Sequence, residues 1–149
     1  MSFYLVTPDV PADFGEVVYD DSYDPPRVVS AHFEFSYPVE RELMKSYSGA
    51  YAVTKPLADA LAQSGLNGYE FGPVTTSISS LVEDPEGFVI PPLFGLIITG
   101  RAFVDDFGIQ GHSKLIGSER AAKFLFDRDE ILRRYSSQLD ENGEIIINL

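Results

Sequence analysis

Histidine is the first residue type to consider for acid–base chemistry, because its side chain titrates near neutral pH. The chain has two, His32 and His112, and Asp105 and Asp106 precede His112 by a few residues. A hydrolase or ligand-converting enzyme could use His112 with either aspartate if the fold brought them together. Residues adjacent in sequence seldom form such a site. We therefore expect no catalytic residue, and we expect His32 to be a hydrogen-bonded histidine within a strand.

Acidic residues are numerous enough to form pairs with the spacing of metal ligands. Three such pairs are Asp20/Asp21, Asp105/Asp106 and Asp127/Asp129. A calcium loop also needs a glycine and a distal glutamate at fixed offsets, and the segment 20–24 has neither. The absence of cysteine excludes thiolate nucleophiles, cysteine-based zinc sites and iron–sulfur clusters. The sequence therefore predicts no bound metal and no cofactor.

The overall charge excludes further classes of function. The chain has 23 acidic and 11 basic residues, which gives a net charge of −12, and its isoelectric point is about 4.4. Nucleic acids and anionic membranes recruit lysine and arginine, and none occurs between Lys55 and Arg101. No glycine-rich phosphate-binding motif is present either. We expect neither nucleic acid nor membrane as a partner, and a basic protein surface fits this charge better.

Length and composition predict one acidic α+β domain over residues 1–149. Hydrophobic residues make up 44% of the chain, enough for a core. The N-terminal segment lacks the basic start of a secretion signal. The longest apolar run, from Phe88 to Gly100, is 13 residues long, too short to span a bilayer. Together with the absence of cysteine, these features favour a cytoplasmic location.

Helices and strands interleave in the predicted order, but several strands follow one another without a helix between them. This favours a mixed or mainly antiparallel sheet packed against two or three short helices. One helix is expected to start after a Thr54 cap and to end at Gly65; the others are expected at Ser118–Phe126 and Asp129–Leu139. Alternation and turn residues predict strands at Phe3–Thr7, Glu16–Tyr19, Arg27–Tyr37, Tyr69–Ser77 (interrupted at Gly72-Pro73), Leu93–Thr99, Arg101–Ile109 and Glu144–Leu149.

Two segments carry a resemblance to a known family. Residues 51–74 read YAVTKPLADALAQSGLNGYEFGPV, and residues 115–125 read LIGSERAAKFL. Together they cover about a quarter of the chain. They resemble the helix–turn–strand and Ser-Glu-Arg helix elements of immunity proteins from bacterial polymorphic toxin and contact-dependent inhibition systems. The paired cysteine motifs of some relatives are absent. The resemblance implies a protein that neutralises a toxin by binding it, and it indicates no catalytic residue.

Charge and resemblance together predict an immunity protein that occludes the active site of a cognate bacterial toxin domain. The toxin class expected is a basic nuclease. The expected contact residues are acidic or aromatic and lie in loops: Asp20, Asp21, Tyr23 and Asp24 first, then Glu83, Asp84 and Glu86. Two alternatives stay open, the hydrolase that uses His112 and a structural or assembly subunit. The sequence does not fix the oligomeric state.

Overall fold

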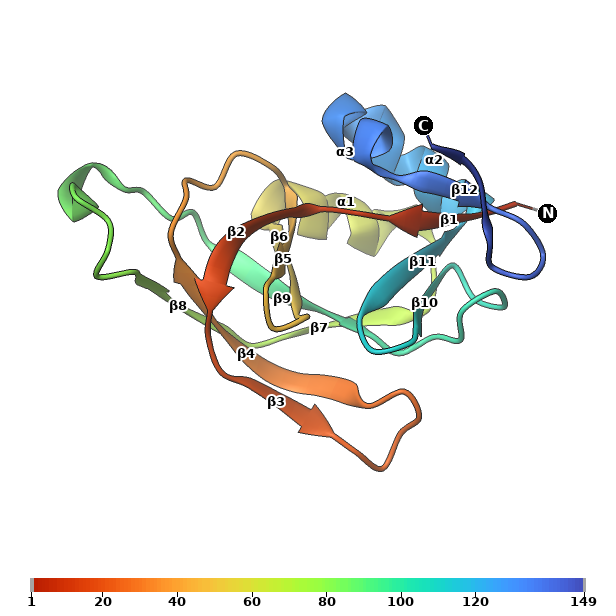
Figure 1. The fold of residues 1–149 in the computed structure, drawn as a ribbon, viewed down its shortest axis with the longest axis horizontal. Helices are drawn as coiled ribbons and strands as arrows, with labels where there is room; N and C mark the ends of the chain where they lie inside the picture. Colours follow the sequence, from red (N-terminus) through yellow and green to blue (C-terminus); the bar gives the residue numbers. More distant parts are fainter. Residues whose placement is uncertain (1, 149) are drawn as a thin grey trace. The chain divides into compact units, whose positions relative to one another are not determined.

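The structure is a computed structural model that describes residues 2–148 (Figure 1). Within them the chain forms thirteen strands: β1 (Phe3–Val6), β2 (Asp9–Phe14), β3 (Val17–Asp20), β4 (Arg27–Phe35), β5 (Leu43–Ser46), β6 (Tyr51–Thr54), β7 (Tyr69–Gly72), β8 (Val74–Ile78), β9 (Leu93–Ile98), β10 (Phe107–Gln110), β11 (Lys114–Ser118), β12 (Ser137–Leu139) and β13 (Ile145–Asn148). The helices in this range are α1 (Lys55–Ser64), α2 (Glu119–Arg128), α3 (Glu130–Tyr135) and the short 3-10 helix η1 (Pro85–Gly87). The predicted α+β class with a mixed sheet and short helices is confirmed.

The chain packs as two units, which we describe separately. The first contains the segments up to Pro8, from Gly65 to Glu70 and from Ile98 onward. The second contains Asp9–Ser64 and Phe71–Ile97.

The first unit is built on an antiparallel sheet of five strands in the order β10-β11-β1-β12-β13. Helix α2 packs on β1 and β11, and its buried residues are Ala121, Ala122 and Leu125. The Ser118 hydroxyl accepts a hydrogen bond from the Ala121 backbone N–H at 3.2 Å, which confirms the predicted cap.

The second unit contains a sheet that curls back on itself. Its strands run β4-β2-β5-β6-β9-β7, and β8, which continues β7 beyond Pro73, pairs in parallel with β4. Strand β3 pairs with β4 as a hairpin arm (Figure 1). The alternation predicted for β4 is confirmed at its centre, where Ala31, Phe33 and Phe35 are buried. These residues pack in a core with Ala12, Met44, Ala50 and Ala52.

Helix α1 is amphipathic, and Leu57, Ala58 and Leu61 are buried. The sequence pattern predicts a stripe of Leu57, Ala60 and Leu61; the two leucines are buried as predicted, whereas Ala60 is half-buried. Gly65 follows the helix with φ of 75°, a left-handed conformation that suits glycine. The expected Thr54 cap is wrong. Thr54 lies just before the helix, but its buried hydroxyl has no hydrogen-bond partner in the described structure.

Two predicted element boundaries are also wrong. Residues 101–106 form turns rather than a strand, because the Asp105 carboxylate accepts a hydrogen bond from the Arg101 backbone N–H at 2.7 Å and closes a tight turn. The third helix ends at Tyr135, and Ser137–Leu139 instead pairs with β1 as β12. Strands β2, β5, β6 and β11 were not predicted as strands.

Candidate protein-binding site

The loop between β3 and β4 carries the first group of predicted contact residues. Asp20 ends β3, and its carboxylate accepts hydrogen bonds from the Ser22 backbone N–H (3.0 Å) and hydroxyl (2.6 Å). The Ser22 hydroxyl is the main cause that lowers the pKa of Asp20 below its ordinary value, so this carboxylate is ionised at neutral pH. This local bonding is an Asx turn, and it gives the loop a defined backbone.

An aromatic–cation contact orders the other end of the same loop. The Arg27 guanidinium lies 3.7 Å from the centroid of the Tyr23 ring. Tyr23 remains 43% exposed, and Asp21 and Asp24 are exposed beside it. The loop therefore presents acidic side chains around an ordered, partly exposed aromatic ring, as the sequence predicts. Their role in binding stays a prediction.

Contacts at its base hold the β3–β4 hairpin in place. The Tyr19 hydroxyl donates to the Ser48 carbonyl at 2.8 Å, and the Ser48 hydroxyl donates to the Gly15 carbonyl at 3.1 Å. Gly15 crosses close to β4: a Cβ atom there would lie 1.8 Å from the His32 carbonyl oxygen. Only glycine permits this approach.

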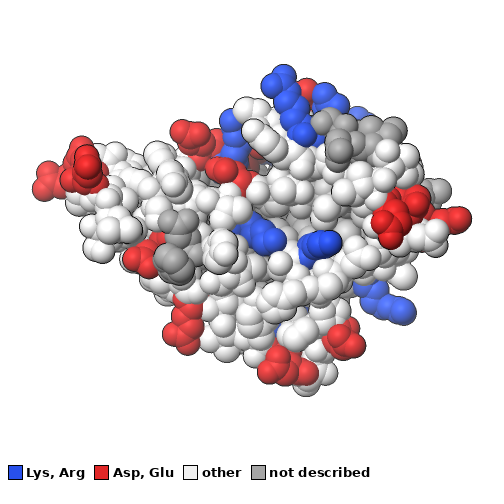
Figure 2. Space-filling model, in the orientation of Figure 1, with Lys and Arg blue, Asp and Glu red and all other residues white. Residues whose placement is uncertain are grey.

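The second predicted group, Glu83, Asp84 and Glu86, lies on the loop that contains η1. All three residues are exposed, and the Asp84 carboxylate accepts a hydrogen bond from the Gly87 backbone N–H at 3.3 Å. Both groups belong to the second unit, but they occupy separate ends of it, as the separate red clusters over these two loops show in Figure 2. The two groups do not form one continuous acidic surface.

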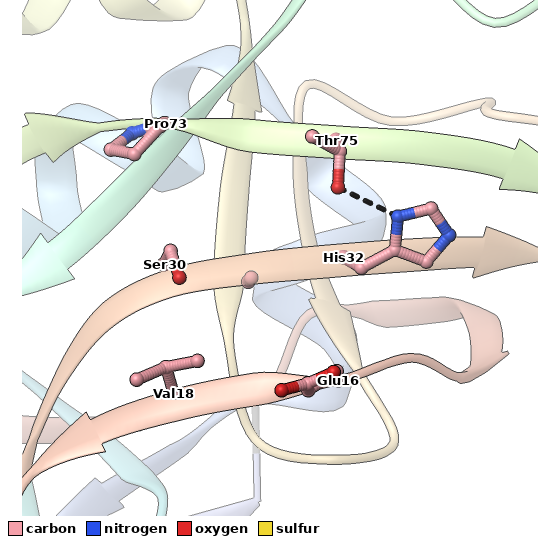
Figure 3. Close-up of a pocket in the computed structure, with 7 residues that line it drawn as sticks. Glu16, Val18, Ser30, His32, Pro73 and Thr75 are labelled. Carbon is pink, nitrogen blue, oxygen red and sulfur yellow. Dashed lines mark hydrogen bonds between the residues drawn. The ribbon is translucent and has the colours of Figure 1, made fainter.

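A shallow hollow lies on the outer surface of β3, β4 and β8, beside the hairpin (Figure 3). Its volume is about 280 Å³, and it is lined by Glu16, Val18, Ser30, Ala31, His32, Pro73 and Thr75. Every lining residue belongs to the second unit. Its lining combines the apolar side chains of Val18, Ala31 and Pro73 with a carboxylate, two hydroxyls and an imidazole.

The imidazole of His32 is held between two hydroxyls of β8. Nδ1 lies 2.7 Å from Thr75 Oγ1, the contact drawn in Figure 3, and Nε2 lies 2.8 Å from Ser77 Oγ. The parallel register pairs His32 with Thr75 and Glu34 with Ser77. The prediction of a hydrogen-bonded strand histidine is confirmed. Thr75 and Ser77 were not predicted, because only this long-range register brings them to His32.

Asp105 and Asp106, the residues considered as partners of His112, accept hydrogen bonds from other residues. The Asp106 carboxylate, whose side chain is 7% exposed, accepts hydrogen bonds from Arg120 (2.6 and 2.8 Å), from the Ser118 hydroxyl (2.7 Å) and from the Asn67 backbone N–H (2.9 Å). The Arg120 hydrogen bonds are the main cause that lowers its pKa to about 2. Such a carboxylate is a poor proton acceptor at neutral pH.

The position of His112 adds a geometric argument. His112 is exposed in the turn of the β10–β11 hairpin, whereas Asp106 lies just before β10. Strand β10 separates them by about 13 Å, since a strand rises about 3.3 Å per residue. This arrangement does not support a catalytic pair of His112 with Asp106, and Asp105 closes the turn at Arg101 at the same end of the hairpin.

Among residues 2–148 no group of three or more potential metal-binding side chains converges. No helix in the described part of the chain has the length and apolar character needed to cross a membrane. Comparisons with protein-family models, with curated proteins and with solved structures gave no match to this chain.

Proposed function

We propose that this protein is a cytoplasmic immunity protein that binds a cognate bacterial toxin domain and occludes its active site. The observation that carries the proposal is the ordered, exposed acidic loop Asp20–Arg27 on a chain of net charge −12. The resemblance of residues 51–74 and 115–125 to immunity proteins supports the same conclusion. A basic nuclease is the toxin class that fits best, because its active site is built to attract phosphate groups.

The proposed mechanism rests on the negative charge of the surface and on the ordered backbone of the acidic loop. A surface of negative charge attracts a positive cleft over several ångströms and raises the rate of encounter. The Asx turn at Asp20 and the stacking of Arg27 on Tyr23 fix the loop before binding. A loop that is already ordered loses less conformational entropy when it binds, so more of the contact energy becomes affinity.

The test is co-expression with the toxin reading frame that neighbours the gene. One variant changes the first expected contact group, Asp20, Asp21 and Asp24, to lysine. A second variant makes the same change in the second expected group, Glu83, Asp84 and Glu86. Each variant raises the formal charge by six, from −12 to −6. We expect the first variant to lose more protection than the second, because direct contact rather than net charge decides binding at an interface.

Three results separate the possible failures. A neighbouring protein that is harmless alone, or that kills equally in the presence of the unchanged protein and does not bind it, would contradict the proposed function. Equal loss of protection in both variants would show that net charge acts without a specific loop. If the first variant still protects, the proposed function stands and the interface lies elsewhere on the protein. Circular dichroism of both variants checks that they are folded.

A further inference from the structure

We infer that the hollow on β3, β4 and β8 is the receptor for one arginine side chain of the partner protein. This inference rests on the proposed function and specifies how the partner is held. The hollow is smaller than the pockets of about 300–1,000 Å³ that hold drug-sized ligands, and much larger than the roughly 30 Å³ that one water occupies. At about 280 Å³ it suits a single long side chain.

The charge of the hollow selects a cation. Glu16 is the one acidic residue in its lining, and its exposed carboxylate forms no ion pair within residues 2–148. Between Gly15 and Phe35 the sequence has five acidic residues and a single arginine, Arg27, which stacks on Tyr23 at the far end of the hairpin. A basic side chain that enters the hollow therefore meets an available carboxylate in an acidic surrounding.

The other lining residues favour arginine. Val18, which is 43% exposed, and the exposed Pro73 lie on either side of Ser30 and offer apolar surface to the methylene groups of a long side chain (Figure 3). The hydroxyls of Ser30 and Thr75 lie on the neighbouring strands and supply acceptors besides Glu16. A guanidinium carries five N–H donors in a plane and can use several acceptors at once, whereas an ammonium acts as a compact charge.

His32 fixes the position of one of these acceptors. Its imidazole bonds Thr75 Oγ1 at 2.7 Å and so restrains a hydroxyl at the rim of the hollow. Strand β3 leads from Val18 to the acidic loop, and Asp21 is about 10 Å away along the strand at about 3.3 Å per residue. One basic segment of the partner can therefore place an arginine in the hollow and further cations against the loop.

The experiment uses the intact protein and a defined probe. Backbone amide NMR signals are followed during titration with the peptide acetyl-Gly-Arg-Gly-amide, with the neutral citrulline peptide of the same shape as control and a lysine peptide as comparison. We expect shifts at Val18, Ser30, His32 and Thr75 with the arginine peptide, weaker shifts with lysine and none with citrulline. Glu16→Gln should weaken arginine binding by about 1.5-fold to fivefold, whereas Glu40→Gln, an equal charge change at another exposed position of the second unit, should not.

Other outcomes would overturn the inference. Equal shifts with citrulline would show that charge does not matter, and shifts confined to residues 20–27 would show that the loop alone attracts the cation. An equal effect of Glu16→Gln and Glu40→Gln would show that net charge, rather than the carboxylate in the hollow, attracts the cation. If the hollow fails this test while the co-expression assay still shows protection, only the inference is wrong. If the unchanged protein does not neutralise the neighbouring toxin, the proposed function fails independently of the peptide result.

Discussion

At the scale of single residues, the lowered pKa of Asp106 predicts that the folded protein loses stability in acid. Its pKa is about 2 in the folded protein against an ordinary 3.8, so its ionised form stabilises the fold fully above about pH 4. This contribution is lost as the pH falls from about 4 to about 2. The shift corresponds to at most about 2 kcal/mol, and solvent around Arg120, whose side chain is 63% exposed, reduces this figure.

Asp106→Asn tests this expectation. The amide cannot ionise, so the variant should be less stable than the parent at pH 7 by about 1–2 kcal/mol and should approach it near pH 2. Urea unfolding at several pH values between 2 and 7 measures the difference in the free energy of unfolding. If this difference in the free energy of unfolding does not change with pH, the charge of Asp106 does not contribute to stability.

The candidate site shows which residues a sequence can reveal. Asp20, Asp21 and Asp24 could be placed in an exposed loop because the signal is local: aspartate, serine and proline favour turns wherever they cluster. The hydroxyl partners of His32 could not be predicted from a local pattern of this kind. Thr75 and Ser77 are 43 and 45 residues from His32 and join it only through the parallel register of β4 and β8.

At the scale of elements, the close crossing at Gly15 predicts a sharp effect of one methyl group. Gly15→Ala would place a Cβ atom 1.8 Å from the His32 carbonyl oxygen, so either the β2–β3 connection or β4 must shift. We expect a loss of about 1–3 kcal/mol in the free energy of unfolding, typical of steric overlap in a packed region. Chemical denaturation measures this loss.

Gly117→Ala is the matched control for that change. Gly117 is buried in strand β11, but an added Cβ there would meet its nearest neighbour, Val6 Cγ2, at an ordinary 3.4 Å. We expect an effect well below that of Gly15→Ala. Similar losses at the two positions would mean that β2, β3 and β4 adjust to relieve the contact at Gly15.

The elements also show where local patterns fail. Strand β4 and helices α1 and α2 were predictable because their apolar periodicity is long enough to define one buried face. Strand β2 was not, since it contains Pro11, which normally argues against a strand. The structure accommodates it at a break in register, where the Pro11 carbonyl accepts the Ser36 and Tyr37 backbone N–H groups.

At the scale of the whole molecule, the net charge of −12 predicts opposite effects of salt on two processes. Repulsion among the acidic side chains opposes folding, so screening by salt should leave the stability unchanged or raise it. Attraction to a basic partner should weaken over the same range. We expect the association rate to fall about tenfold or more between 0.02 and 0.5 M NaCl, with little change in the dissociation rate.

Stopped-flow mixing with the partner domain measures both rates, and thermal unfolding in the same buffers measures the stability. An association rate that does not depend on salt would contradict electrostatic steering, although it would leave occlusion possible. The reversal variant at Asp20, Asp21 and Asp24 should show a smaller salt dependence than the parent.

The pairing of β1 has a consequence for the order in which the chain folds during synthesis. Strand β1 leaves the ribosome before the other strands, but Phe3 pairs with Ser118 and Leu139, so its partners emerge more than a hundred residues later. The curled sheet of the second unit needs nothing beyond β9. Units tend to fold as they emerge, and pairing between distant residues is slow. The hairpin that carries the acidic loop therefore folds before β1 can pair with β11 and β12.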